Sequence, residues 1–146
     1  MSVPGRQVAQ AVIQTIVAAS GRSCGYSTVP TSQSLPTGAQ LPYHVLYELG
    51  QSVSGPPFGD QAADARLLFQ VTTVGSSPEA ASSGADRVRA AFLGRTAKGA
   101  GWQYPITLPT GYTVMGRDLD REDGMTVAGS TYSYVQRFAV HVTTTG

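Results

Sequence analysis

Hydrophobic residues recur along the chain with two different periods, one typical of helices and one typical of strands. The helical spacing of about three to four positions fills residues 4–20 and 78–93. Gly21 and Gly94 follow these stretches as natural stops, and Ser77-Pro78 supplies a capping serine and a first-turn proline for the second. The pattern therefore predicts two amphipathic helices.

Each predicted helix has one apolar stripe that we expect to face the core. In the first helix the stripe is Val8, Val12, Ile16 and Ala19, widened by Ala9, Ile13 and Val17. In the second it is Ala81, Ala85, Val88 and Phe92.

The two-residue period of a half-buried strand is clearest in residues 131–144, where Tyr134 and Phe138 share a face. Residues 65–74 are apolar on both faces, which predicts a central strand. The predicted strands are 43–49, 65–74, 112–119 and 131–144, with a further short one at 104–108. These elements predict a single α+β domain over residues 1–146, with a mainly antiparallel sheet of four to five strands and two helices packed on one face.

Two segments, residues 22–40 and 50–63, are rich in glycine, proline and serine and interrupt the periodic pattern. We expect both to be long irregular loops, which in compact domains are often functional. Among their few hydrophobic residues, Phe58 is a candidate anchor that a partner surface could receive.

Charge is scarce, at 13% of residues, and the formal net charge is only +1. A chain this weakly charged has no overall field that would concentrate nucleic acid or an anionic membrane. Cys24 is the only cysteine, so an internal disulfide and a multi-thiolate zinc site are excluded. No stretch is apolar for long enough to predict a membrane span or a signal segment.

The most enzyme-like stretch is residues 117–123, which holds four carboxylates. In the register of a calcium loop that starts at Asp118, an aspartate stands where glycine is needed and a glycine where the bidentate glutamate belongs. We interpret the stretch as a solvated turn between strands or as a contact surface. His44 and His141 are interpreted as structural, and no nucleophile or phosphate-binding motif is present. The sequence therefore predicts no catalytic, cofactor or metal site.

Clustered opposite charges in a charge-poor chain favour contacts that fix the register between subunits. We therefore predict an interface along a charged strip that joins the second helix to residues 117–123. Its members are Asp86, Arg87, Arg89, Arg117, Asp118, Asp120 and Arg121, with Phe58 from the second loop.

Nearly the whole chain resembles the tail terminator proteins of long-tailed, siphovirus-type bacteriophages that infect actinobacteria. The most specific strings are SGPPFGD at 54–60, ADRVR at 85–89 and SYVQRF at 133–138, which accompany VMGRDLDREDG at 114–124. None of these strings carries a catalytic mechanism.

The resemblance implies a virion structural protein, assembled in the host cytoplasm and located in the neck region of the tail. It implies a homohexameric ring that caps the tail tube, ends tube growth and meets a head-side connector or stopper protein. DNA passes through such a ring without sequence-specific binding. Two alternatives remain: another neck protein, such as a head-closure or tail-completion factor, and a small metal- or ligand-binding domain that uses the carboxylates of residues 118–123.

Overall fold

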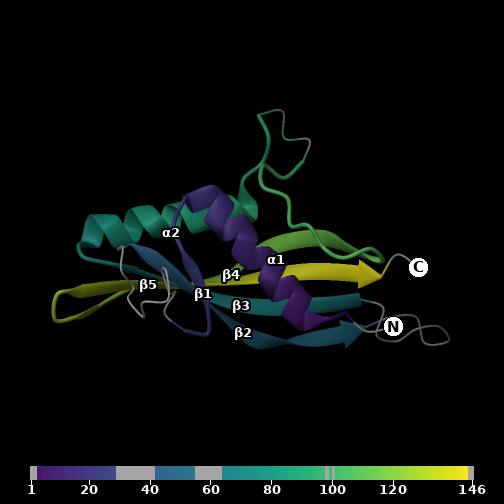
Figure 1. Ribbon diagram of the computed structural model, residues 1–146, viewed down its shortest axis with the longest axis horizontal. Coiled ribbons are helices and arrows are strands. Elements are labelled where there is room, and N and C mark those ends of the chain that lie inside the picture. Colours follow the sequence, from purple (N-terminus) through teal and green to yellow (C-terminus); the bar gives the residue numbers. More distant parts are fainter. Residues whose placement is uncertain (1–2, 29–41, 55–63, 98, 100, 145–146) are drawn as a thin grey trace.

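The computed structural model describes residues 3–28, 42–54, 64–97, 99 and 101–144. Within these residues, two helices and five strands follow one another in an α–β–β–β–α–β–β order (Figure 1). They are α1 (Gly5–Ser20), β1 (Cys24–Tyr26), β2 (Tyr43–Ser54), β3 (Asp64–Gly75), α2 (Pro78–Leu93), β4 (Tyr112–Ala128) and β5 (Thr131–Thr144).

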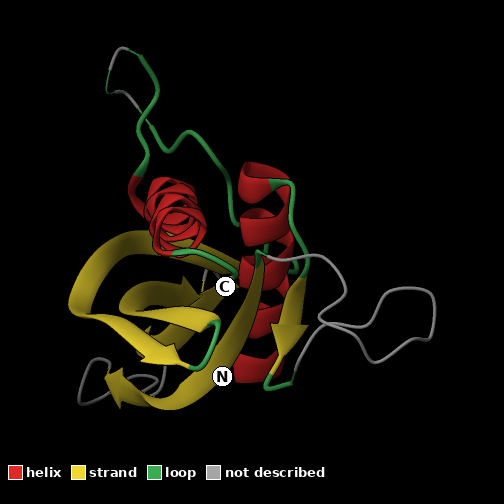
Figure 2. Ribbon diagram, turned by 90° about the vertical axis from the view of Figure 1, so that its left-hand side faces the viewer, coloured by secondary structure: helices red, strands yellow, loops and turns green. Residues whose placement is uncertain are grey.

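The strands form one sheet in the order β1-β2-β3-β5-β4. Only β1 runs parallel to its neighbour, and the other pairs are antiparallel. Both helices lie on the same side of this curved sheet (Figure 2). The predicted fold class, an α+β protein with a mainly antiparallel sheet and two helices on one face, is confirmed.

The hydrophobic core lies between the helices and the sheet. The central strand β3 contributes to it, because its residues are alternately buried and half-buried along its whole length. Its residues that face the helices, such as Leu67, Phe69 and Val71, are buried, and those between them are half-buried. The ring of Phe92 from α2 stacks on Phe138 of β5 with centroids 4.1 Å apart. The prediction that Val17 belongs to the buried stripe of α1 is wrong, because this residue is 39% exposed.

The α2 helix approaches the sheet closely at Gly84. A methyl group on Gly84 would lie 2.5 Å from Cγ2 of Thr73 on β3, which is closer than any van der Waals contact. Because of this close approach, position 84 needs a glycine, although glycine weakens a helix interior.

The α2 helix begins as predicted. The Ser77 side chain accepts a hydrogen bond from the backbone N–H of Ala80.

Apart from β4, three boundaries differ from the sequence prediction. Residues 24–26, expected in a loop, form β1 by pairing with 44–46, a non-local contact that no local pattern announces. The β2 strand continues to Ser54 because Gly50, at φ 104°, absorbs a bulge opposite β3. Residues 104–108 are not a strand, and in that region only an isolated bridge joins Arg95 to Trp102.

The acidic stretch at 118–123 is not a turn. It is the middle of β4, a strand of 17 residues that pairs with β5 along its whole length. Three register shifts in β4 leave Met115, Asp120 and Asp123 as extra residues without a partner in register on β5. Neither described helix is long and apolar enough to cross a membrane.

Candidate assembly surface

The β4 strand forms one edge of the sheet, and its alternation divides the acidic stretch between the two faces. Asp118 pairs in register with Ala139 and so lies on the face away from the helices. Glu122 pairs with Gln136 and lies on the helix face. The same stretch of sequence therefore supplies two separate charge clusters.

On the helix face, Glu122 is the acceptor for several donors. Arg89 of α2 donates to it through Nε at 3.0 Å and through Nη2, and the buried Gln136 donates at 2.9 Å. Arg89 also pairs with Asp86 at 2.8 Å. The hydrogen bond from Gln136 lowers the pKa of Glu122, and Arg89 lowers it further against the opposing effect of burial. The charges of α2 are thus tied to β4.

On the open face, three positively charged or titratable side chains meet two aspartates. Nε2 of His141 lies 2.7 Å from Asp118, and Nη2 of Arg66 lies 3.1 Å from Asp120. Arg137 approaches the second oxygen of Asp120 at 3.9 Å. Strands β3, β4 and β5 therefore join their charges across this face.

Within β4 itself, Arg121 and Asp123 pair at 2.5 Å. We call the whole group the β4 edge cluster: Asp86, Arg89, Asp118, Asp120, Arg121, Glu122 and Asp123. Three of its side chains, those of Asp86, Asp118 and Arg121, are 67%, 63% and 63% exposed. The structure thus brings together most of the strip predicted from the sequence, and every member already has a partner in its own chain.

Arg117 does not belong to this surface, because it is only 5% exposed. Its Nη1 donates to the carbonyl of Tyr104 at 2.7 Å and to that of Ala91 at 3.3 Å, and its guanidinium lies 4.7 Å from the Trp102 ring centroid. Burial, and then the positive charge of Arg95, lower the pKa of Arg117 to about 10. Arg117 therefore fastens the segment that projects between α2 and β4 (Figure 1) to the end of α2.

Arg87 lies on the other side of α2 from the β4 edge cluster. It donates to the carbonyl of Ser20 at 3.0 Å and so satisfies the end of α1. Phe58 and most of both predicted loops, at 29–41 and 55–63, lie outside the described residues.

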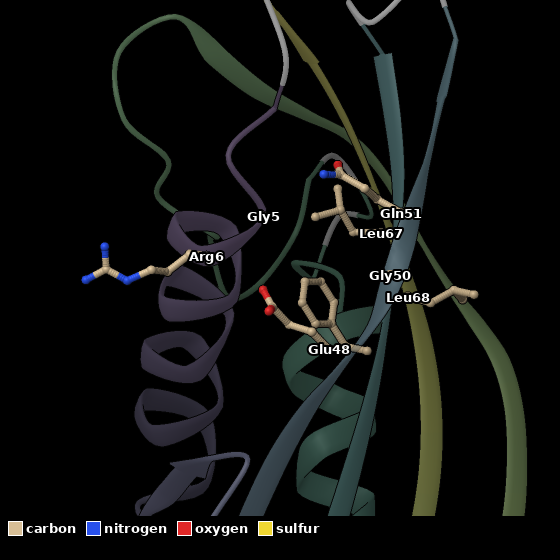
Figure 3. A pocket seen from close by; sticks show the side chains of 8 residues that line it. Gly5, Arg6, Glu48, Gly50, Gln51, Leu67 and Leu68 are labelled. Atoms are coloured by element: carbon tan, nitrogen blue, oxygen red, sulfur yellow. The ribbon is translucent and has the colours of Figure 1, made fainter.

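The edge of the molecule opposite to β4 is formed by α1 and β1, and the charges in this stretch of the chain are positive. Residues 5–26 contain Arg6 and Arg22 and no acidic residue. Figure 3 shows Arg6 pointing outward while Glu48 points toward α1, beside a cavity of about 140 Å³. Sequence analysis did not select these arginines, although the lack of any acid over this stretch was a usable signal.

The cysteine and one of the two histidines lie half-buried or buried within the fold. Burial raises the pKa of Cys24 to about 12, so its thiol stays protonated at neutral pH. His44 is fully buried, with Nδ1 2.9 Å from Oγ1 of Thr73. Within the described ranges, no group of three or more His, Cys, Asp or Glu side chains is placed to hold a metal ion.

No protein-family model and no curated protein matches the sequence. Solved structures with a similar fold include a chain of the virion of a native gene transfer agent (GTA) particle. That chain is 19% identical, the alignment covers 95% of this chain and 93% of the other, and the TM-score is 0.61. The chain thus shares its fold, over nearly its full length, with a component of a virion particle.

Proposed function

We propose that this chain is a virion structural protein that forms a hexameric ring, caps the tail tube of a phage-like particle and ends its growth. The observation that carries the proposal is the fold shared with a chain of a GTA virion over 95% of this chain. The resemblance to tail terminator proteins, which rests on separate residues of the sequence, suggests the same kind of particle.

Charge on the two edges supports contact between the β4 edge of one copy and the α1–β1 edge of the next. The β4 edge cluster contains five acidic residues and two arginines, and Arg66 and Arg137, which pair with Asp120, bring the net charge of this edge to −1. Residues 5–26 contain two arginines and no acid. An interface between two different edges is heterologous, and heterologous contacts close into rings when the rotation between subunits allows it. Complementary charge would set the register of that contact.

In this proposal the two ends of the ring meet different partners: the tail tube protein and the head-side connector or stopper protein. DNA passes through the channel without sequence-specific contacts. Phe58 and the parts of the two predicted loops that lie outside the described residues, 29–40 and 55–63, are proposed to make these docking contacts. Of the sequence-predicted residues, the exposed Asp86, Asp118 and Arg121 are the ones we propose for contact between subunits.

Particles assembled without the chain test the function. We expect tubes of uncontrolled length that do not join heads, and normal particles once the wild-type chain is supplied. Tubes of normal length with unjoined heads would instead assign the chain to head closure. Normal joined particles would contradict any role in the neck.

Electron microscopy and native mass spectrometry of the purified chain test the ring separately. We expect a closed six-fold ring alone or on tube ends. Calcium or magnesium titration distinguishes the metal-binding alternative: thermal stabilisation that is lost in Asp118→Ala with Asp120→Ala would favour it over the structural role.

A further inference from the structure

A second cavity, of about 170 Å³, lies between the start of β2 and α2. It is separate from the β4 edge cluster, and it shares only Arg22 with the charged residues of the α1–β1 edge. Its lining is rich in hydrogen-bond donors: Arg22, Arg87, Ser83 and His44, beside Pro42, Ala80 and Gly84.

Among the described residues, the two arginines of this cavity have no acidic partner. None of the ion pairs among the described residues involves Arg22 or Arg87. Arg87 is held in place by its hydrogen bond to the Ser20 carbonyl, a neutral acceptor that leaves the guanidinium charge uncompensated. Two cationic groups thus line one small cavity, and no carboxylate of the described part of the chain pairs with either.

His44 provides the second, independent observation. Its ring is fully buried, its Nδ1 is bonded to Thr73 on β3, and its Nε2 has no hydrogen-bond partner among the residues that the structure describes. His44 is also one of the residues that line the cavity. When the Thr73 hydroxyl donates to Nδ1, Nε2 carries the proton and is a donor without an acceptor. A buried donor of this kind is costly unless something accepts from it.

We propose that this cavity binds a small oxyanion, such as phosphate or a carboxylate group. The two guanidinium groups supply charge, and Nε2 of His44 with the Ser83 hydroxyl supplies neutral donors. The oxygens of a phosphate or carboxylate group can accept hydrogen bonds from these four donor groups, whereas a cation or an apolar ligand can accept none. The contributing residues come from three places in the fold, so the anion also joins α2 to the start of β2 and to the turn after α1.

Nuclear magnetic resonance of the imidazole nitrogens tests the site on the intact chain, because His44 and His141 are its only histidines. Inorganic phosphate, added at constant ionic strength with chloride as the reference salt, should shift the His44 signals and leave those of His141 unchanged. Arg22→Gln and Arg87→Gln should each weaken binding about tenfold, the loss expected for one charge-assisted contact. Arg6→Gln removes an arginine outside the cavity and should bind phosphate as the wild type does.

Acetate, tested in the same way, identifies the source of the ligand. A response to both anions extends the site to a carboxylate side chain of another protein, and a response to phosphate alone restricts it to free phosphate. The proposal is overturned if neither anion moves the His44 signals, if His141 moves equally, or if Arg6→Gln weakens binding as much as the cavity variants do. None of these outcomes depends on whether the chain forms a ring.

Discussion

Arg117 is a buried cation whose hydrogen-bond acceptors are backbone carbonyls and whose guanidinium faces an indole ring. Its Nε has no partner, and its positive charge is compensated by no carboxylate among the described residues. The arginine fork suits this position because it reaches several carbonyls while it lies against Trp102. The residue is therefore a structural clamp for the segment that follows α2.

Replacing Arg117 with methionine should destabilise the fold by about 2–3 kcal/mol, because several hydrogen bonds to buried carbonyls are lost together. Urea unfolding measures the loss. The fluorescence of Trp102, the only tryptophan, should change in the folded state as its neighbouring charge disappears. Arg121→Met, on the same strand but 63% exposed, is the control and should change stability by less than about 0.5 kcal/mol. Equal losses in the two variants would contradict the clamp.

His44 makes the stability of the fold depend on pH. Burial, and then the charges of Arg22 and Arg87, lower its pKa from 6.5 to about 4. Between these two values the unfolded chain binds more protons than the folded chain, so stability is full above about pH 6.5 and falls as the pH drops. The loss should approach about 3 kcal/mol near pH 4, of the order set by the shift in pKa.

Urea unfolding at several pH values, in buffer free of phosphate and sulfate, measures this dependence. In His44→Gln the fall in stability over the same interval should be much smaller. Because the pKa of Glu122 is lowered in the folded chain, this carboxyl adds a further loss of stability when the pH falls below its ordinary pKa of 4.5. A wild-type stability that stays flat from neutral pH to pH 5 would show that His44 titrates normally.

The charge clusters were only partly predictable at the residue scale. The strip of Asp86, Arg89 and residues 118–123 was visible because opposite charges stood out in a charge-poor sequence. The burial of Arg117 was not, because it depends on the register of β4 against β5 and on Trp102, which no local spacing encodes.

At the scale of elements, α2 approaches the sheet most closely at a position that has no side chain. Gly84 lets the helix backbone approach Thr73, while Val88 and Phe92 fill the core farther along the helix. The periodic stripes of both helices and the alternation of β3 and β5 were predictable, since each buries one face against a neighbour. Strand β1 and the second half of β4 were not, because their pairing partners are distant in sequence or their alternation is broken by bulges.

Gly84→Ala isolates this close approach. Alanine is the better helix former by about 1 kcal/mol, yet its methyl group would clash with Thr73, and overpacking of this kind costs about 1–3 kcal/mol. We expect a net loss of stability in thermal or urea unfolding. Gly84→Ala combined with Thr73→Ser, which removes the clashing methyl group, should recover part of the loss. A variant Gly84→Ala that is more stable than wild type would show that the helix can move away from the sheet without cost.

At the scale of the whole molecule, the sheet places two edges of opposite charge on opposite sides of one core. The β4 edge is long and interrupted by register shifts, while the α1–β1 edge is short and is flanked by a groove of about 410 Å³ that Arg6 and Tyr26 line. Register shifts and charges hinder indiscriminate pairing of an edge strand. A molecule with two unlike edges is suited to head-to-tail contact, in which each copy uses one edge for each neighbour.

Charge reversal at these edges tests the proposed ring. Arg6→Glu on one edge and Asp118→Arg on the other should each reduce ring formation at low salt, because each replaces an attraction between neighbouring subunits with a repulsion. A change of about 1 kcal/mol per contact corresponds to about a fivefold weaker association at each seam, and the repeated seams of a ring multiply the effect. Combining the two reversals should restore part of the assembly, since the charges again match. Glu79→Lys, a reversal at the exposed start of α2, is the control and should assemble as the wild type does. Native mass spectrometry at low and high salt measures the ring fraction, and rings that persist unchanged in both single variants at low salt would show that the seam lies elsewhere on the molecule.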